Sequence, residues 1–439
     1  MSSGPRILCA DRKQLYWDMI DLDSQIEVDH LVRVIWSFVE TLDLSALYDA
    51  IRARDEVAGR PTADPKVLLS LWLYAAAEGV GSARALERLC QAHAAYRWLC
   101  GGVPVNYHTL SDFRGGHGAL LDRVLSESVA SLAAAGLVSL EEIAVDGTKV
   151  KANAGRSSYR GQRGLERYRA DAELRIARLK EELCGDPGVS ERRRLARAKG
   201  AAEQVQARAE AARRKLEELQ AERTERSKTH AQEEARKSEP KVSMTDPQAR
   251  LMRFADGGTR PAYNVLLASA PEAQIIVGAQ ISERRNETGL ASPLLDEFAD
   301  RYGGRPKRLL VDTKFATRAE IVALSVHPEG ATVVYSPVPA ASRRATPESL
   351  RKRRWRHARE PAALRDWRQR MASLEGQLIY ARRRLIETVN GHLKNHGLSR
   401  LMLRGAEKVR CEVLLGAIAH NLRRGQALRR LAAAAGAGP

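Results

Sequence analysis

The chain has 439 residues, enough to bury more than one hydrophobic core, so two or three structural units are expected. Lysine and arginine total 72, and the formal net charge of +18 favours a polyanionic partner, of which nucleic acid is the simplest. The five cysteines are scattered without a C-x-x-C pair, which argues against a disulfide framework or a zinc site and fits a reducing cytoplasm. No apolar run reaches membrane-spanning length, and no signal peptide is expected at the N-terminus.

Residues 20–135 are expected to form helices. Apolar side chains recur at helical spacing over residues 28–47, 65–77 and 120–137, and glycines separate these segments. A DNA-binding role for this part of the chain is one interpretation, and a structural helical bundle is the other.

Residues 142–152 read EIAVDGTKVKA, an apolar run that ends on Asp146 and continues into a second, basic run. The pair Asp146-Gly147 is a strong signal for a β-hairpin turn. The alternative is a carboxylate placed at the edge of a strand to bind a metal ion. The residues of this segment leave both interpretations open.

Residues 164–239 are rich in Ala, Glu, Arg, Lys and Leu, and their apolar side chains follow steps of three and four residues. The sequence GDPG at 185–188 interrupts this pattern, which predicts two helices joined by a turn in an antiparallel hairpin. Because β-type sequence precedes and follows the hairpin, we expect it to be an insertion in another domain.

Alternating strands and helices are expected after the hairpin. The predicted order is two strands at 263–268 and 274–280, a helix at 287–301, a strand at 308–312, a helix at 317–324 and a strand at 331–335. The strand at 308–312 ends on Asp312, as the earlier apolar run ends on Asp146. Residues 341–370 are expected to be a basic, tryptophan-bearing spacer, and residues 411–431 a final amphipathic helix.

Residues 380–394 carry four functional groups that share one stripe of a helix, at about 100° per residue. They are the hydroxyl of Tyr380, the guanidinium of Arg383, the carboxylate of Glu387 and the ammonium of Lys394. One interpretation is a solvated helix face with an Arg383–Glu387 ion pair. The other is a site that holds a metal ion and grips the phosphates around it.

Asp146, Asp312 and Glu387 together predict a cage of three carboxylates. In an open α/β sheet, ligands gather where the carboxyl ends of adjacent parallel strands meet. Crowded carboxylates repel one another unless cations neutralise them, and hard oxygen ligands select Mg²⁺ or Mn²⁺. Two such ions can activate a water or a 3′-hydroxyl and stabilise the leaving oxygen in an in-line attack on phosphate.

The spacing Tyr380-x2-Arg383-x3-Glu387-x6-Lys394 resembles the Y-R-E-K signature of one branch of bacterial insertion-sequence DDE transposases. Residues 144–153 (AVDGTKVKAN) resemble the segment around the first catalytic aspartate of that family, and residues 309–312 (LLVD) resemble the segment around the second. Further similar segments lie at residues 65–73, 109–114, 245–252, 261–264, 403–405 and 420–423.

This resemblance implies an α/β fold in which an RNase H-like mixed sheet forms the catalytic core. It further implies an all-helical, DNA-binding N-terminal domain at residues 1–138 and a long helical-hairpin (coiled-coil) insertion at 161–240. The catalytic domain would comprise residues 139–160 and 241–425, followed by a low-complexity tail at 426–439.

By the same resemblance, Asp146, Asp312 and Glu387 are the catalytic residues and the ligands of two Mg²⁺ or Mn²⁺ ions. The side chains expected to contact DNA are Tyr380, Arg383, Lys394, Lys149, Lys151 and Lys314. The implied function is binding to the terminal inverted repeats of an insertion sequence, with metal-dependent cleavage and strand transfer by a homodimer on paired ends in the bacterial cytoplasm, at the nucleoid. The alternatives are a DNA-binding derivative without catalysis and a coiled-coil scaffold that rests on residues 164–239.

Two details of the resemblance concern single residues. Relatives in this branch can pass through a DNA hairpin, which requires displaced bases to be accommodated, and Trp355 and Trp367 are candidates to stack on such a base. Ordinary packing is the alternative for both. Small residues commonly follow the second aspartate in the family, whereas this chain has Thr313, Lys314 and Phe315. Lys314 could contact a phosphate or mark a decayed copy, but the intact acidic triad favours an active enzyme.

Overall fold

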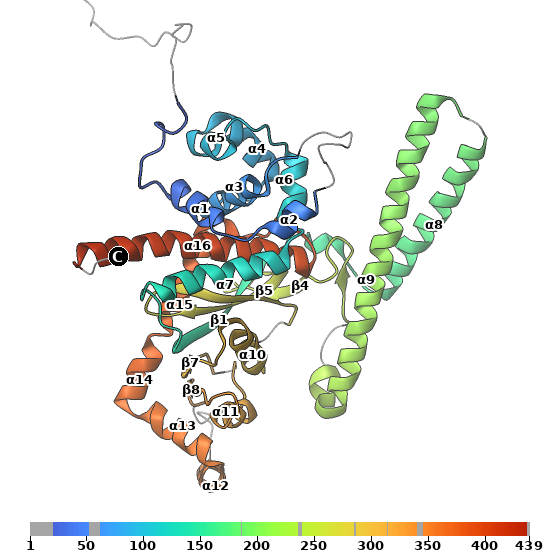
Figure 1. Cartoon of the computed structure of the whole chain (residues 1–439). Helices are drawn as coiled ribbons and strands as arrows, with labels where there is room; N and C mark the ends of the chain where they lie inside the picture. The colour runs from blue at the N-terminus through green and yellow to red at the C-terminus, as the bar shows by residue number, and fades with distance from the viewer. Residues whose placement is uncertain are drawn as a thin grey trace, which may run out of the picture.

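The computed structural model describes residues 21–51, 62–185, 187–235, 239–284, 287–313, 315–339 and 346–436. Figure 1 shows helices above a sheet, a long helical hairpin that projects to one side, and further helices below. The mixed sheet with many helices confirms the expected α/β class at this level. None of the described helices combines the length and the apolar character that a membrane span requires.

The N-terminal part consists of helices packed around one apolar helix. They are α1 (Leu31–Glu40), α2 (Ser45–Asp49), α3 (Pro65–Ala77), α4 (Ala83–Ala92), α5 (Ala94–Cys100), α6 (Tyr107–Arg114) and α7 (Gly118–Ala134). The Asp64 side chain accepts a hydrogen bond from the amide of Lys66, and Pro65 occupies the first helical position of α3, so the start of α3 is well specified. Since α3 is apolar on all sides, it must be surrounded, and α1, α5, α6 and α16 contact it.

The sheet combines antiparallel and parallel strands. Its strands are β1 (Glu142–Lys151), β4 (Arg250–Arg253), β5 (Thr259–Ala270), β6 (Ile275–Ser282), β7 (Arg308–Leu310) and β8 (Val333–Tyr335). The strand order is β4-β5-β1-β7-β8, and β6 also pairs with β5. The β1–β5 and β5–β6 pairs are antiparallel, whereas β7 and β8 run parallel to β1. Helix α10 (Ala291–Tyr302) lies in the connection that leads to β7, and helix α11 (Arg318–Ser325) lies in the connection from β7 to β8.

β1 continues without a break through Asp146 and Gly147. These residues pair with Leu267 and Leu266 of β5 inside one antiparallel ladder, so the hairpin interpretation of Asp146-Gly147 is wrong. Long-range pairing with β5 overrides the local turn preference of the Asp-Gly pair. The parallel ladder between β1 and β7 has its last pair at Ala144 and Leu310. Asp146 and Asp312 each lie two residues beyond this pair, where the two strands separate.

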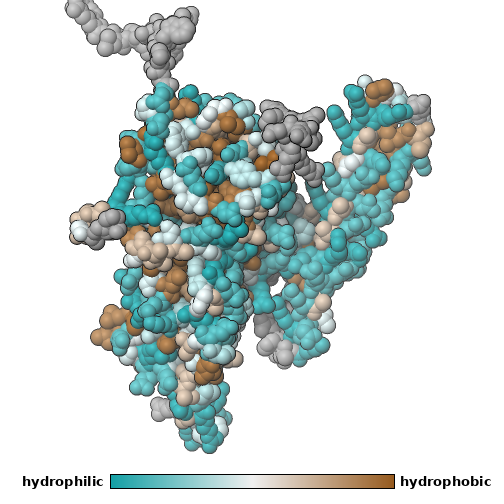
Figure 2. Space-filling view, in the orientation of Figure 1, coloured by the Kyte–Doolittle hydropathy of each residue, from teal (hydrophilic) through white to brown (hydrophobic). Residues whose placement is uncertain are grey.

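The helical hairpin is inserted between two short paired strands. β2 (Tyr159–Arg160) and β3 (Val242–Ser243) pair antiparallel, and α8 (Gln162–Cys184) and α9 (Val189–Ala235) extend from them, which confirms the predicted hairpin. Small apolar clusters join the two helices along their length. Figure 2 shows a mostly hydrophilic surface over the hairpin, as expected for two helices that share one narrow apolar seam.

The C-terminal part is more helical than expected. Its helices are α12 (Pro347–Ala358), α13 (Ala362–Ala372), α14 (Leu374–Ala381), α15 (Arg384–Leu393) and α16 (Ala406–Ala434). The expectation of a spacer at 341–370 is therefore wrong for the described residues from 346 onward. Thr346 caps α12 by accepting a hydrogen bond from the Ser349 amide, and Pro347 takes the first helical position. The high charge of this segment concealed a regular helix start.

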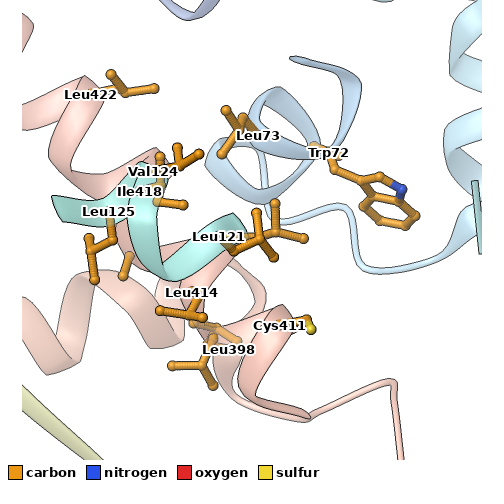
Figure 3. Close-up of a cluster of buried hydrophobic side chains, with 14 of the residues drawn as sticks. Trp72, Leu73, Leu121, Val124, Leu125, Leu398, Cys411, Leu414, Ile418 and Leu422 are labelled. Carbon is orange, nitrogen blue, oxygen red and sulfur yellow. The ribbon is translucent and has the colours of Figure 1, made fainter. Parts of the chain in front are cut away.

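α16 lies between the N-terminal helices and the sheet, with contacts to α1, α3, α7 and β6. Figure 3 shows side chains of α16, α7 and α3 gathered in one cluster, among them Leu414, Ile418, Leu121, Val124 and Leu73. This buried cluster extends from α1 and α3 to β1 and β5, so one core joins the N-terminal helices to the sheet. A second core lies on the other face of the sheet, under α10, α11 and α13.

Candidate active site

The three predicted acidic residues come from three different elements. Asp146 lies within β1, Asp312 follows β7, and Glu387 lies in the first turn of α15. Burial raises the pKa of Asp146 above its usual value, the charge of Arg383 opposes this, and the charges of Glu387 and Asp312 raise the pKa further. The charges of Asp312 and Glu387 thus act on the carboxyl of Asp146, and Asp146 and Asp312 lie on neighbouring strands at the fork where β1 and β7 separate.

Arg383 bridges two of these acids. Its Nη2 donates to Asp146 Oδ1 at 2.8 Å, and its Nη1 donates to Glu387 Oε1 at 3.3 Å. Asn390, one turn further along α15 than Glu387, donates from Nδ2 to Asp146 Oδ2 at 2.8 Å. Both carboxylate oxygens of Asp146 therefore accept a hydrogen bond, one from Arg383 just before α15 and one from Asn390 within α15. The guanidinium of Arg383 occupies the place of a cation between two carboxylates.

The predicted single helix over residues 380–394 is wrong. Tyr380 lies near the end of α14, whereas Arg383 is the residue immediately before α15. Between them the chain forms a tight, 3₁₀-type turn. Its backbone amides at Arg382, Arg383, Leu385 and Ile386 donate to carbonyl oxygens three residues earlier. Lys394 is exposed and begins a π-helical segment (Lys394–Leu398), not a continuation of α15.

The charges of the acidic residues still act on the Tyr380 hydroxyl despite the break. Burial raises the pKa of its hydroxyl, Arg383 lowers it, and the charges of Asp312, Glu387 and Asp146 raise it again. The tight turn lets α14 approach from one side while α15 lies along β1. Three members of the predicted stripe therefore converge on the fork, through two helices instead of one.

The predicted basic contacts are distributed differently. Lys149 and Lys151 are odd-numbered positions of β1, so strand alternation places them on the face opposite Asp146. Lys149 Nζ donates to the carbonyl oxygen of Arg253 at 2.7 Å, and Lys151 is exposed at the end of β1. Lys314 lies outside the described residues.

The two candidate tryptophans have different environments. Trp367 is 4% exposed within the second core, and its Nε1 donates to the carbonyl oxygen of Ser336 at 3.0 Å. Ordinary packing accounts for Trp367. Trp355 on α12 is 57% exposed, and the Arg359 guanidinium carbon lies 3.7 Å from its ring centroid.

Two polar residues of the site are absent from the sequence-based prediction. Asn390 shares the helical stripe of Arg383 and Glu387, so its spacing was a usable signal. Glu287 precedes α10, and its Oε1 accepts a hydrogen bond from Asn264 Nδ2 at 3.3 Å. Burial raises the pKa of Glu287, the Asn264 hydrogen bond lowers it, and the charges of Asp146 and Asp312 raise it further. No local pattern marks Glu287, because its neighbours come from β1 and β5.

The donor set of the site suits a hard divalent cation. Carboxylate and amide oxygens are the ligands that Mg²⁺ and Mn²⁺ prefer. Within the described residues, no group of three or more His, Cys, Asp or Glu side chains converges closely enough to hold an ion in the present arrangement. Because Arg383 stands between Asp146 and Glu387, these two carboxylates can converge on an ion only when its guanidinium moves away.

Two segments of the chain match models of known families. Residues 20–116 match a family described as Transposase domain (DUF772). Residues 342–425 match a family described as Transposase DDE domain, and this segment includes Tyr380, Arg383 and Glu387. No curated protein and no solved structure matches the chain. The two family matches support an insertion-sequence DDE transposase and a function in DNA transposition.

Proposed function

We propose that the protein binds the terminal inverted repeats of an insertion sequence and catalyses metal-dependent DNA cleavage and strand transfer with Asp146, Asp312 and Glu387. The observation that supports this proposal is the Arg383 side chain, which donates to both Asp146 and Glu387 beside the point where β1 and β7 separate and Asp312 follows β7. The match of residues 342–425 to a transposase DDE domain agrees with it. The Tyr380-x2-Arg383-x3-Glu387-x6-Lys394 spacing favours the Y-R-E-K branch.

The proposed catalytic core is RNase H-like. Its support is the order of the strands: the antiparallel strands β1, β5 and β6 lie next to the parallel strands β7 and β8. The two aspartates follow the paired segments of neighbouring parallel strands, which is where an open sheet gathers its ligands.

Asp146, Asp312 and Glu387 would hold Mg²⁺ or Mn²⁺, as two ions, through their carboxylate oxygens. When bound, such ions supply activation of a water or a 3′-hydroxyl and stabilise the leaving oxygen. Asn390 holds the orientation of Asp146 through Oδ2. Arg383 neutralises the acids while the site is free, and its planar guanidinium is then available to a DNA phosphate, which it can contact through two hydrogen bonds.

Double-stranded DNA is the proposed partner, both as transposon end and as target. The net charge of +18 provides the electrostatic attraction, and exposed basic residues of α12 next to Trp355, such as Lys352 and Arg356, extend it beyond the site. Tyr380, Arg383 and Lys394 would contact the end near the cleaved phosphate, and Lys149 and Lys151 would contribute from the other face of β1. A homodimer on paired ends, in the cytoplasm at the nucleoid, completes the proposal.

The test compares DNA cleavage with DNA binding. Asp146→Asn, Asp312→Asn and Glu387→Gln should each reduce Mg²⁺-dependent cleavage of a DNA carrying the cognate end by at least about a hundredfold. Binding in a mobility-shift assay should remain, because these residues are not the source of the basic charge. Asp300→Asn, an exposed position of α10, is the control and should cleave as the unaltered chain does. Unchanged cleavage in the three site variants would refute the assignment.

The same assay separates the proposal from a DNA-binding derivative without catalysis. If the unaltered protein binds its ends but does not cleave them in Mg²⁺ or Mn²⁺, the enzymatic part of the proposal is wrong and the binding part remains.

A further inference from the structure

We propose that one face of helix α9, in the helical hairpin, binds the phosphate backbone of double-stranded DNA at a place separate from the candidate active site. This surface is the basic stripe, which we define as Arg193, Arg197 and Arg208. The inference rests on the proposed function in one respect, because it takes DNA as the polyanion that the protein binds.

The three arginines of the basic stripe share one face of α9. At about 100° per residue, their side chains point within roughly 60° of one another, and all three residues are exposed. The buried seam of α9 lies on a different side, where apolar residues recur at intervals of seven: Leu195, Ala202, Ala209 and Leu216. The stripe is therefore not used to hold the hairpin together.

No acidic side chain neutralises the basic stripe. On a helix surface, a charged residue pairs with residues three or four positions away. Around Arg193, Arg197 and Arg208, none of these positions holds an Asp or a Glu. Among the residues that the structure describes, the three arginines form no ion pair. Arg193 and Arg197 are moreover four residues apart, so their charges repel each other and an external anion would relieve this repulsion.

The other flank of the hairpin shows that its cations can be paired. Arg169, Lys199 and Arg213 each contact the carboxylate of a glutamate four residues further on, at N···O distances of 3.5, 3.5 and 2.6 Å. Glu203, the acidic residue of α9 between Arg193 and Arg208, belongs to this flank. Positive and negative charges are thus segregated around α9. The adjoining part of α8 does not share this bias, because Arg175 and Arg178 are accompanied there by acidic residues, Asp171 and Glu182.

A DNA duplex fits the basic stripe in charge and in length. From Arg193 to Arg208 the stripe spans about 22 Å, a length over which duplex DNA carries about 13 phosphate charges. Arginine can donate two parallel hydrogen bonds to one phosphate. A second copy of this chain is a poor match, because its net charge is +18.

The basic stripe continues towards the sheet domain. Lys215, seven residues beyond Arg208 on the same face of α9, pairs with Glu283 Oε2 at 2.6 Å just after β6. Figure 1 shows the hairpin projecting away from the sheet domain. DNA bound along the stripe would therefore lie on the side of the hairpin that is turned to the sheet domain, and the hairpin would lengthen the DNA-binding surface of the protein.

The test measures the affinity of the full-length protein for a fluorescent DNA duplex of random sequence, because phosphate contacts do not depend on sequence. The variant Arg193→Gln/Arg197→Gln/Arg208→Gln should bind at least about tenfold more weakly at about 0.1 M salt. The slope of log K against log salt concentration should fall in magnitude by about 2 to 3, one contact for each arginine. Glutamine is a good helix former, and circular dichroism checks that the hairpin remains helical.

The matched control removes the same number of positive charges from the other flank of the hairpin. Arg169→Gln/Lys199→Gln/Arg213→Gln should bind the duplex within about threefold of the unaltered chain, because these side chains already pair with glutamates. Equal losses in the two triple variants would show an effect of net charge alone and would overturn the inference. Unchanged binding in the stripe variant would overturn it as well.

Cleavage measurements separate this inference from the proposed function. If the stripe variant binds the duplex normally and Asp146→Asn still prevents cleavage, the inference is wrong and the proposed function stands. If the stripe variant binds weakly and Asp146→Asn cleaves normally, the inference stands and the catalytic assignment is wrong. If the stripe variant binds the duplex normally but light scattering shows a changed mass, the stripe contacts protein and the inference is wrong.

Discussion

Single buried polar residues give the fold a pH dependence that can be measured. His420 of α16 donates from Nε2 to the carbonyl oxygen of Gln274 at 2.8 Å, in the turn between β5 and β6. Burial lowers the pKa of His420 to about 4, the hydrogen bond to Gln274 opposes this, and the nearby His392, Arg424 and His396 lower it further. The ring is therefore neutral at pH 7 in the folded protein.

The sign of the pH effect follows from this depressed pKa. The unfolded chain takes up the proton near pH 6.5 and the folded chain only near pH 4, so the stabilisation by His420 is complete above pH 6.5 and is lost as the pH falls towards 4. Between pH 7.5 and 5.0, the unaltered protein should lose about 2 kcal/mol more unfolding free energy than His420→Gln. Urea unfolding at the two pH values measures the difference, and equal losses would contradict the assignment.

At the residue scale, the three acids of the candidate site could be predicted from the sequence. Asp146 and Asp312 were visible because each follows an apolar run, and Glu387 because Arg383 accompanies it at a fixed spacing. Asn390 could have been added from the same spacing. Glu287 could not, because its contacts with Gly147 and Asn264 join residues that lie far apart in the chain.

At the scale of elements, the corner between α13 and α14 positions Tyr380. Ser373 caps α14, accepting a hydrogen bond from the Gly376 amide at 3.1 Å and donating to the carbonyl oxygen of Arg370 at 2.7 Å. A Cβ atom at Gly376 would lie 2.0 Å from the carbonyl oxygen of Arg370. The two helices can therefore meet at this angle only if residue 376 has no side chain.

Gly376→Ala should accordingly destabilise the protein by about 1–3 kcal/mol, although alanine is the better helix former. The clash is with backbone, which no change of rotamer can relieve. Gly391→Ala in α15, where a Cβ meets nothing within 4 Å, is the matched control and should raise the unfolding free energy by up to about 1 kcal/mol. Equal effects of the two substitutions in urea unfolding would show that the corner is not tight.

Elements whose apolar residues recur with a regular period could be predicted from the sequence, whereas the junctions between elements could not. The helix at 65–77, the strands β5 and β6 and the helical hairpin follow from apolar spacing and turn residues. Two predictions failed, one because of a long-range contact and one because of local backbone hydrogen bonds. β5 pairs with β1 straight through Asp146-Gly147, and the break between α14 and α15 leaves every residue helical in its dihedral angles while changing the hydrogen bonds.

At the scale of the whole molecule, the helical hairpin is an appendage to a core that closes without it. Arg160 of β2 pairs directly with Val242 of β3, so the chain leaves and re-enters the sheet domain at one point. Contacts between the hairpin and the sheet domain include the ion pair of Lys215 Nζ with Glu283 Oε2 at 2.6 Å. The main cores contain none of the hairpin residues.

Replacing residues 161–241 by Asn-Gly should therefore leave the remaining domain folded, because two such residues close an antiparallel pair in a tight turn. We expect a single cooperative thermal transition within a few degrees of the intact chain, a change of about 1 kcal/mol. Circular dichroism measures both the transition and the loss of helix. A deletion variant without a cooperative transition would show that the hairpin is part of the folding unit.

The central place of α16 has a consequence for how the protein is made. The ribosome releases α1, α3 and α7 long before residues 406–434, yet the apolar faces of these helices are covered by α16. Until α16 is synthesised, the apolar surface of these N-terminal helices therefore stays exposed and is available to chaperones. A gene interrupted before codon 406 should therefore yield no stably folded fragment, and truncated copies should be degraded by proteases.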